Sequence, residues 1–85
     1  MPRLFLHIDD GTQRIEDEEG RELLDLTAAR GEALDAARQL WASAILAGHD
    51  IKAHRFVIAG HDGRVLETVD VDDVLPKRLT GRLNT

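Results

Sequence analysis

The sequence contains no cysteine among its 85 residues. A chain without cysteine forms no disulfide and offers no thiolate as a nucleophile or metal ligand, which suits a reducing compartment. The sequence also has no apolar run near the roughly 18 residues of a membrane span, and no apolar segment of a secretory signal follows Met1. We therefore expect a cytoplasmic protein with no membrane association.

Positive charge is scarce over most of the chain. All sixteen acidic residues precede Pro76, and the last ten residues hold three basic residues and no acid. An acidic body repels phosphate, and three basic side chains are too few for strong phosphate binding at physiological salt. We do not expect direct nucleic-acid binding. Length and composition predict a single domain over residues 1–75 and a flexible basic tail over residues 76–85.

The stretch from Asp25 to Gly48 predicts a long helix. Asp25 or Thr27 can accept the unpaired N–H groups of its first turn, and Gly48 suits a left-handed C-cap. One face of this helix is rich in alanine, which allows a close approach to a sheet. The residues of that face are Leu26, Ala29, Ala33, Ala37, Leu40 and Ala44.

Short alternating segments flank the predicted helix on both sides. Before it, residues 3–9 alternate and lead through Asp10-Gly11 to a polar return strand over residues 13–17; residues 21–24 follow as a short extended segment. After it, residues 55–59 and 64–71 predict two strands joined through Asp62-Gly63, with a brief helical turn over residues 72–75. The buried side of the last strand is left open. We predict an α+β fold: a small antiparallel β-sheet, built as β-hairpin, long α-helix and β-hairpin, with the helix packed on one face.

Several short motifs, taken in order, resemble a family of small bacterial domains of unknown function. The resemblance extends from about Pro2 to Val71 and implies a fold type and a bacterial source, but no activity. This chain lacks the aromatic residue and the proline that members often have at the positions of Leu4 and Leu24. The motifs are Pro2-Arg3-Leu4-Phe5-Leu6-His7-Ile8, Asp10-Gly11, Asp17-Glu18-Glu19-Gly20-x-Glu22-Leu23, Asp25-Leu26, Ala28-Ala29-Arg30, Glu32-Ala33 and Asp62-Gly63-Arg64-Val65-Leu66.

A more distant likeness concerns residues 24–44. A short strand, an Asp-Leu start and a helix rich in Ala, Glu and Arg also occur in HicB-like antitoxins, which place a sheet against one helix. This likeness is an analogy of architecture.

The first candidate interaction surface lies on the first strand. Arg3, Phe5 and His7 share the strand face that points away from Leu4, Leu6 and Ile8. An exposed aromatic ring beside titratable groups is typical of a binding surface. The alternative is that Phe5 and His7 pack beneath the tail or in a dimer interface.

The second candidate interaction surface lies on one flank of the predicted helix. Leu34, Trp41 and Ile45 widen the apolar arc beyond the alanine face. Two interpretations stay open: a partner surface, such as a homodimer interface, or a flank covered by strand ends together with Leu23 and Leu24.

The sequence predicts no catalytic, cofactor or metal site. The four histidines have no metal-ligand spacing, and the acidic run of residues 16–19 lacks the spacing of a calcium loop. Our leading hypothesis is a non-catalytic interaction or regulatory domain that forms a homodimer and possesses the two candidate surfaces. The second is an antitoxin-like, nucleic-acid-linked regulator whose acidic body faces a basic protein. A small enzyme is the third.

Overall fold

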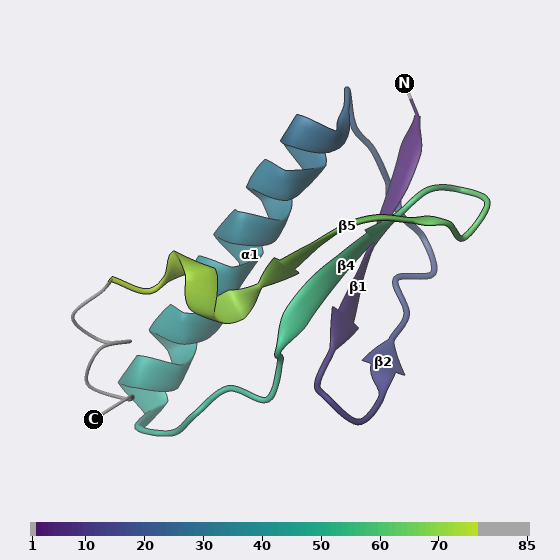
Figure 1. Cartoon of the computed structure of the whole chain (residues 1–85). Coiled ribbons are helices and arrows are strands. Elements are labelled where there is room, and N and C mark those ends of the chain that lie inside the picture. The colour runs from purple at the N-terminus through teal and green to yellow at the C-terminus, as the bar shows by residue number, and fades with distance from the viewer. Residues whose placement is uncertain (1, 77–85) are drawn as a thin grey trace.

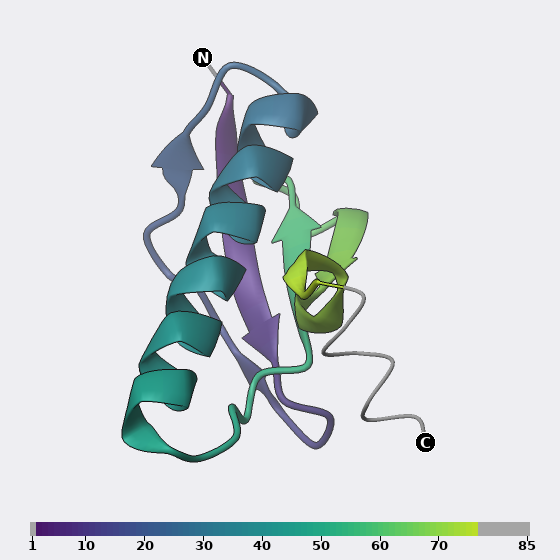
Figure 2. The same ribbon diagram turned by 90° about the vertical axis from the view of Figure 1, so that its left-hand side faces the viewer.

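A long helix lies across one face of an antiparallel sheet in the computed structural model of this chain (Figure 1). The structure describes residues 2–76. The turned view in Figure 2 shows the helix in front of the sheet. This arrangement confirms the predicted α+β class. The elements are β1 (Arg3–Asp9), β2 (Arg14–Ile15), β3 (Arg21–Glu22), α1 (Leu26–Ala47), β4 (Arg55–Ala59), β5 (Val65–Asp70) and the short 3-10 helix η1 (Val71–Val74).

The helix α1 begins and ends where its capping residues predict. The Asp25 side chain accepts a hydrogen bond from the Ala28 backbone N–H at 2.9 Å, which satisfies one unpaired donor of the first turn. At the other end Gly48 has φ 77°, and its N–H donates to the carbonyls of Ala44 and Ile45. The predicted helix over residues 25–48 is therefore confirmed together with its two caps.

The alanine face of α1 is the contact surface with the sheet. Three of its alanines have no exposed surface, and the large side chains of the core come from the strands and from η1. Because methyl groups are small, the helix approaches the sheet closely, as the sequence predicts. The buried core consists of Leu4, Ala29, Ala33, Ala37, Phe56, Ile58, Val69 and Val71.

Strand β1 has hydrogen-bonded neighbours along both of its edges. On one side it pairs with β4, which pairs in turn with β5, all antiparallel. On the other side β1 pairs with β2 near Ile8 and with β3 near Leu4. Both short strands run antiparallel to β1, and so does β4. Hence β3 and β4 run in the same direction without pairing with each other. The helix α1 connects them, and β1 lies between them in the sheet.

The second edge of β1 departs from the predicted return strand over residues 13–17. Only Arg14 and Ile15 pair there, and pairing resumes at β3 after a gap. Ile8 pairs with Ile15, whereas Leu4, four residues earlier, pairs with Arg21, six residues later. The edge strand therefore contains two extra residues and is interrupted by a loop over residues 16–20.

The buried side of β5, which the sequence left open, is set by a β-bulge. Ile58 pairs with Glu67 but Ala59 pairs with Val65, so Leu66 is the extra residue. Val65 and Val69 would share a face in a regular strand, and the bulge places them on opposite faces. Val69 is buried against the helix, whereas Val65 and Leu66 are 48% and 44% exposed.

The remaining boundaries are close to those predicted. Strand β4 matches the predicted residues 55–59, β5 is one residue shorter at each end than predicted, and η1 begins one residue before the predicted helical turn. Of the predicted flexible tail, residues 77–85 lie outside the described residues. The domain boundary at Pro76 therefore stays a prediction.

Two glycines of α1 provide a paired test of the helix. Gly31→Ala should raise the free energy of unfolding by about 1 kcal/mol, because Ala favours the helix and the added Cβ meets nothing within 4 Å. Gly48→Ala should lower it by about 1 kcal/mol, because an L-residue is strained at positive φ. Urea denaturation of both variants measures the two shifts, and shifts of the same sign would contradict the assigned C-cap.

Candidate functional site

The side chain of Asp17 bridges the gap between β2 and β3 along the edge of β1. One carboxylate oxygen accepts a hydrogen bond from the Leu6 backbone N–H, and the other accepts one from Gly20, both at 3.1 Å. The Leu6 N–H belongs to the β1 edge that faces the gap. The carboxylate therefore replaces a strand-to-strand hydrogen bond that the looped-out backbone does not make.

These hydrogen bonds set the charge state of Asp17. Partial burial alone would raise the pKa of its carboxyl group, but the backbone N–H groups of Leu6, Gly20 and Glu19 outweigh burial, and the pKa is lowered from its usual 3.8. Asp17 is therefore ionised at neutral pH, which suits its role as an acceptor.

His7 lies directly beside this carboxylate and is only 8% exposed. Its Nδ1 accepts a hydrogen bond from the Asp17 backbone N–H at 3.0 Å, and a Glu16 carboxylate oxygen lies 3.2 Å from the same nitrogen. Both contacts are made to the same ring nitrogen, so the imidazole ties the loop to β1.

The other two residues of the first candidate surface hold the same loop. The Phe5 ring stacks on His7 with centroids 6.3 Å apart. Gly20 packs against this ring at positive φ, and a Cβ there would lie 2.7 Å from it. The Arg3 guanidinium donates to the Glu19 carbonyl at 2.7 Å.

The structure thus brings Arg3, Phe5 and His7 together as the support of the loop over residues 16–20. His7 is buried, which corrects the expectation of an open sheet face at this position. The physical reason is the loop itself, which donates a backbone N–H to the imidazole. The use of this surface in binding stays a prediction.

Part of the second candidate surface packs against η1 and the core. The Trp41 indole N–H donates to the Val71 carbonyl at 2.9 Å, and Leu34 and Trp41 pack against the core. Ile45 remains 64% exposed. Leu34 and Trp41 are therefore covered, and Ile45 is not. Of the two leucines in the alternative, Leu23 packs against the core and Leu24 is exposed.

The histidines do not form a metal centre in the described part of the chain. His49, His54 and His61 are all exposed. Across residues 2–76 no three His, Asp or Glu side chains are arranged to hold a metal ion.

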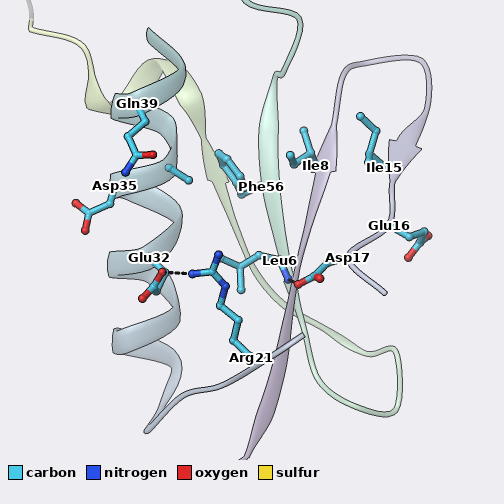
Figure 3. A pocket seen from close by; sticks show the side chains of 11 residues that line it. Leu6, Ile8, Ile15, Glu16, Asp17, Arg21, Glu32, Asp35, Gln39 and Phe56 are labelled. Carbon is cyan, nitrogen blue, oxygen red and sulfur yellow. Dashed lines mark hydrogen bonds and ion pairs between the residues drawn. The ribbon is translucent and has the colours of Figure 1, made fainter. Parts of the chain in front are cut away.

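The sequence did not predict a groove that opens between α1 and the interrupted edge (Figure 3). We call it the edge groove; its volume is about 390 Å³. Aliphatic and aromatic side chains form its floor, and four acidic residues are part of its lining. Two of them have partners outside the edge groove: Asp35 is paired with Arg38 at 2.8 Å, and Glu16 lies 3.2 Å from His7. An ion pair between Arg21 of β3 and Glu32 of α1 spans one end. The lining residues are Leu6, Ile8, Ile15, Glu16, Asp17, Arg21, Glu32, Asp35, Ala36, Gln39 and Phe56.

A second cleft continues the edge groove toward the C-terminal end of α1. It has a volume of about 630 Å³ and shares Ile8 and Ile15 with the edge groove. Ile15 is 58% exposed at this junction. In the sequence, the one sign of this cleft was Ile15, the single isoleucine in the polar segment over residues 13–17. The apolar residues added by the second cleft are Leu40, Ala44, Ala47, Ile51 and Ala53.

Fold and groove together define a small α+β domain with one helix and an uncovered strip of sheet beside it. The chain belongs to the family described as a domain of unknown function, DUF6894, whose sequence profile matches residues 3–72. Comparisons with curated proteins and with solved structures gave no match. Over the described residues, no helix has the length and apolar character needed to cross a membrane.

Asp17→Asn tests the capping carboxylate. An amide offers one acceptor where the carboxylate offers two, so the variant should lose about 2 kcal/mol of unfolding free energy at pH 7. The pKa of Asp17 is lowered on folding, so its contribution is fully present above pH 3.8 and is lost as the pH falls through the lower folded-state value. The difference from wild type should therefore shrink in acid.

Urea denaturation at several pH values measures this difference. Glu18→Gln is the control, because it removes an exposed carboxylate of the same loop and should change the unfolding free energy by less than about 0.5 kcal/mol. Equal losses in the two variants would contradict the capping role of Asp17.

Proposed function

We propose that this domain is a non-catalytic protein-interaction module that binds a segment of a partner protein in the edge groove. The observation that supports the proposal is the apolar floor, left open between α1 and the interrupted edge strand. A small domain gains from covering such a surface, at roughly 25 cal/mol for each Å² of apolar area removed from water.

The polar groups of the edge groove favour binding over catalysis. Asp17 is occupied by two backbone donors, and Arg21 and Glu32 are paired with each other. The lining of the edge groove includes no Ser, Thr or His that could act as a nucleophile or base. The lowered pKa of Asp17 also makes it a poor proton donor at neutral pH.

Self-association is a second component of this proposal. On the sheet face opposite α1, Phe5 is aligned with Ala59 and Ala59 with Val65. Ala59 is buried and the loop over residues 16–20 packs on Phe5, so the exposed end of this apolar row is Val65 on β5, which is 48% exposed. No helix covers this face in the described part of the chain. Beside it, β5 pairs only with β4 among the described strands, so one of its edges is available to a second copy.

The antitoxin-like alternative is compatible with the same groove. A regulator of that kind sets an acidic body against a basic protein. Four acidic residues line the edge groove, of which Glu32 and Asp35 are paired with Arg21 and Arg38. In that case the edge groove would contact the protein partner rather than nucleic acid, whose phosphates its carboxylates repel.

Filling the edge groove should weaken peptide binding. We expect panning of a random phage-displayed peptide library against the wild-type domain to enrich specific sequences. Gln39→Trp, which places an indole over the apolar floor, should weaken these peptides by about tenfold or more. Fluorescence anisotropy of labelled peptides measures the loss.

Ala42→Trp is the matched control for this experiment. It introduces the same side chain at an exposed position of α1, outside the lining of both clefts. Its affinity should stay within about twofold of wild type. The proposal fails if the library yields no specific peptide, or if both variants weaken binding equally.

Sedimentation equilibrium tests self-association. The wild-type domain should be dimeric at high micromolar concentration, and Val65→Lys should shift it toward monomer by placing a charge in the apolar row. Ala42→Lys adds the same charge on the exposed side of α1 and should leave the dimer unchanged. A monomeric wild-type protein would rule out this component of the proposal.

A further inference from the structure

The longest free strand edge in the described chain belongs to β5. This strand extends over Val65–Asp70 and pairs with β4 on one side only (Figure 2). The opposite border of the sheet consists of β2 and β3, which have two residues each and are separated by the loop over residues 16–20. An unpaired edge presents backbone N–H and C=O groups that another strand can satisfy.

The backbone direction of each β5 residue follows from its pairing with β4. The Val71 N–H donates to the His54 carbonyl at 3.0 Å, which continues the register of the two strands. Because hydrogen-bonded pairs alternate along an antiparallel ladder, residues 67, 69 and 71 direct their backbone groups to β4. Thr68 and Asp70 therefore direct their N–H and C=O groups to the free side.

The side chains of β5 leave this edge open to pairing. Lysine and proline, which often protect strand edges, are absent from residues 65–70. The acidic side chains have cationic partners within the same copy: Glu67 is paired with Arg30 at 2.9 Å, and Asp70 lies 3.8 Å from Arg55. The β-bulge at Leu66 bounds the regular edge at one end and η1 bounds it at the other, so pairing is limited to residues 66–70.

The alternation of the backbone restricts how two copies of this edge can meet. Two-fold pairing requires that residues directed to the free side meet each other. An axis at Thr68 meets this condition and uses residues 66–70. An axis at Glu67 would set two Glu67 side chains opposite each other, and like charges in that position are destabilising. An axis at Val69 would align Leu66 with Asp72, which belongs to η1, so only residues 68–70 could pair.

We propose that β5 pairs antiparallel with β5 of a second copy about a two-fold axis at Thr68, which joins the two sheets into one. The inference rests on the self-association component of the proposed function and specifies its interface. The edge complements itself in this register, because Thr68 faces Thr68, Leu66 faces Asp70, and no acid faces another acid. Both copies of α1 then lie on the same face of the joined sheet.

Thr68→Pro tests the free edge in the full chain. Proline lacks the N–H that Thr68 directs away from β4, so the variant loses no hydrogen bond within its own sheet. It should stay folded by circular dichroism and raise the dimer dissociation constant by about tenfold or more in sedimentation equilibrium. Thr68→Ala, which keeps the N–H, is the matched control and should change this constant by less than about threefold.

Single cysteines test the register, because the chain contains no cysteine of its own. Thr68→Cys should form a disulfide-linked dimer under mild oxidation, since the two opposed Cα atoms lie about 5.5 Å apart in this register. Asp70→Cys is the matched control on the same edge. The two Asp70 positions are offset along the strands by the distance from residue 66 to residue 70, about 13 Å. Non-reducing electrophoresis should show crosslinking about tenfold faster for Thr68→Cys.

The outcomes separate this inference from the proposed function. If Thr68→Pro folds and dimerises like wild type, or if the two cysteine variants crosslink at the same rate, the β5 pairing is wrong and self-association stands on the wild-type dimer. If Thr68→Pro does not fold, the cysteine variants decide alone. A wild-type chain that is monomeric at high micromolar concentration overturns the β5 pairing together with the self-association component.

Discussion

The carboxylate of Asp17 is the constraint on which the open side of this fold depends. It holds the backbone of β1 at Leu6 where the edge strand is interrupted, and it turns the loop back at Gly20. The same loop then donates to His7 and packs Gly20 against Phe5. A regular edge strand would itself make the backbone hydrogen bonds to β1, and its side chains would extend the apolar sheet face beyond Ile15. The edge groove is open because the Asp17 side chain takes the place of that strand.

This constraint also gives a physical account of two motifs on which the family resemblance rests. The strand motif with Phe5 and His7 and the turn motif from Asp17 to Gly20 are separated in sequence but form one hydrogen-bonded unit. Neither requires an activity to explain it. The interaction proposals therefore rest on the surfaces that this unit leaves open rather than on the motif residues themselves.

The predictable parts of the structure are those that local chemistry determines. Asp25 and Gly48 mark the ends of α1 through their capping chemistry, and the alternation of residues 3–9 identifies β1. The unpredicted parts depend on register. The extra residue at Leu66 reverses the face of Val65, and the side-chain cap at Asp17 becomes visible only once β1 and the loop are placed side by side. The edge groove combines residues from five elements, α1, β1, β2, β3 and β4, with those of the loop, so no local pattern could identify it.

The alanine face of α1 has a consequence for how the helix is located along its own axis. Helices usually settle into register because large side chains on one surface fill gaps on the other. Methyl groups fill such gaps poorly, so a smooth alanine face resists separation from the sheet more than it resists sliding. Leu34, Leu40 and Trp41 of α1, which pack against the core, supply part of the axial restraint. Three polar links add to it: Arg21 with Glu32, Arg30 with Glu67, and the Trp41 indole with the Val71 carbonyl. The first of these lies in the edge groove, so a ligand that competes for Glu32 would act on the longitudinal position of the whole helix.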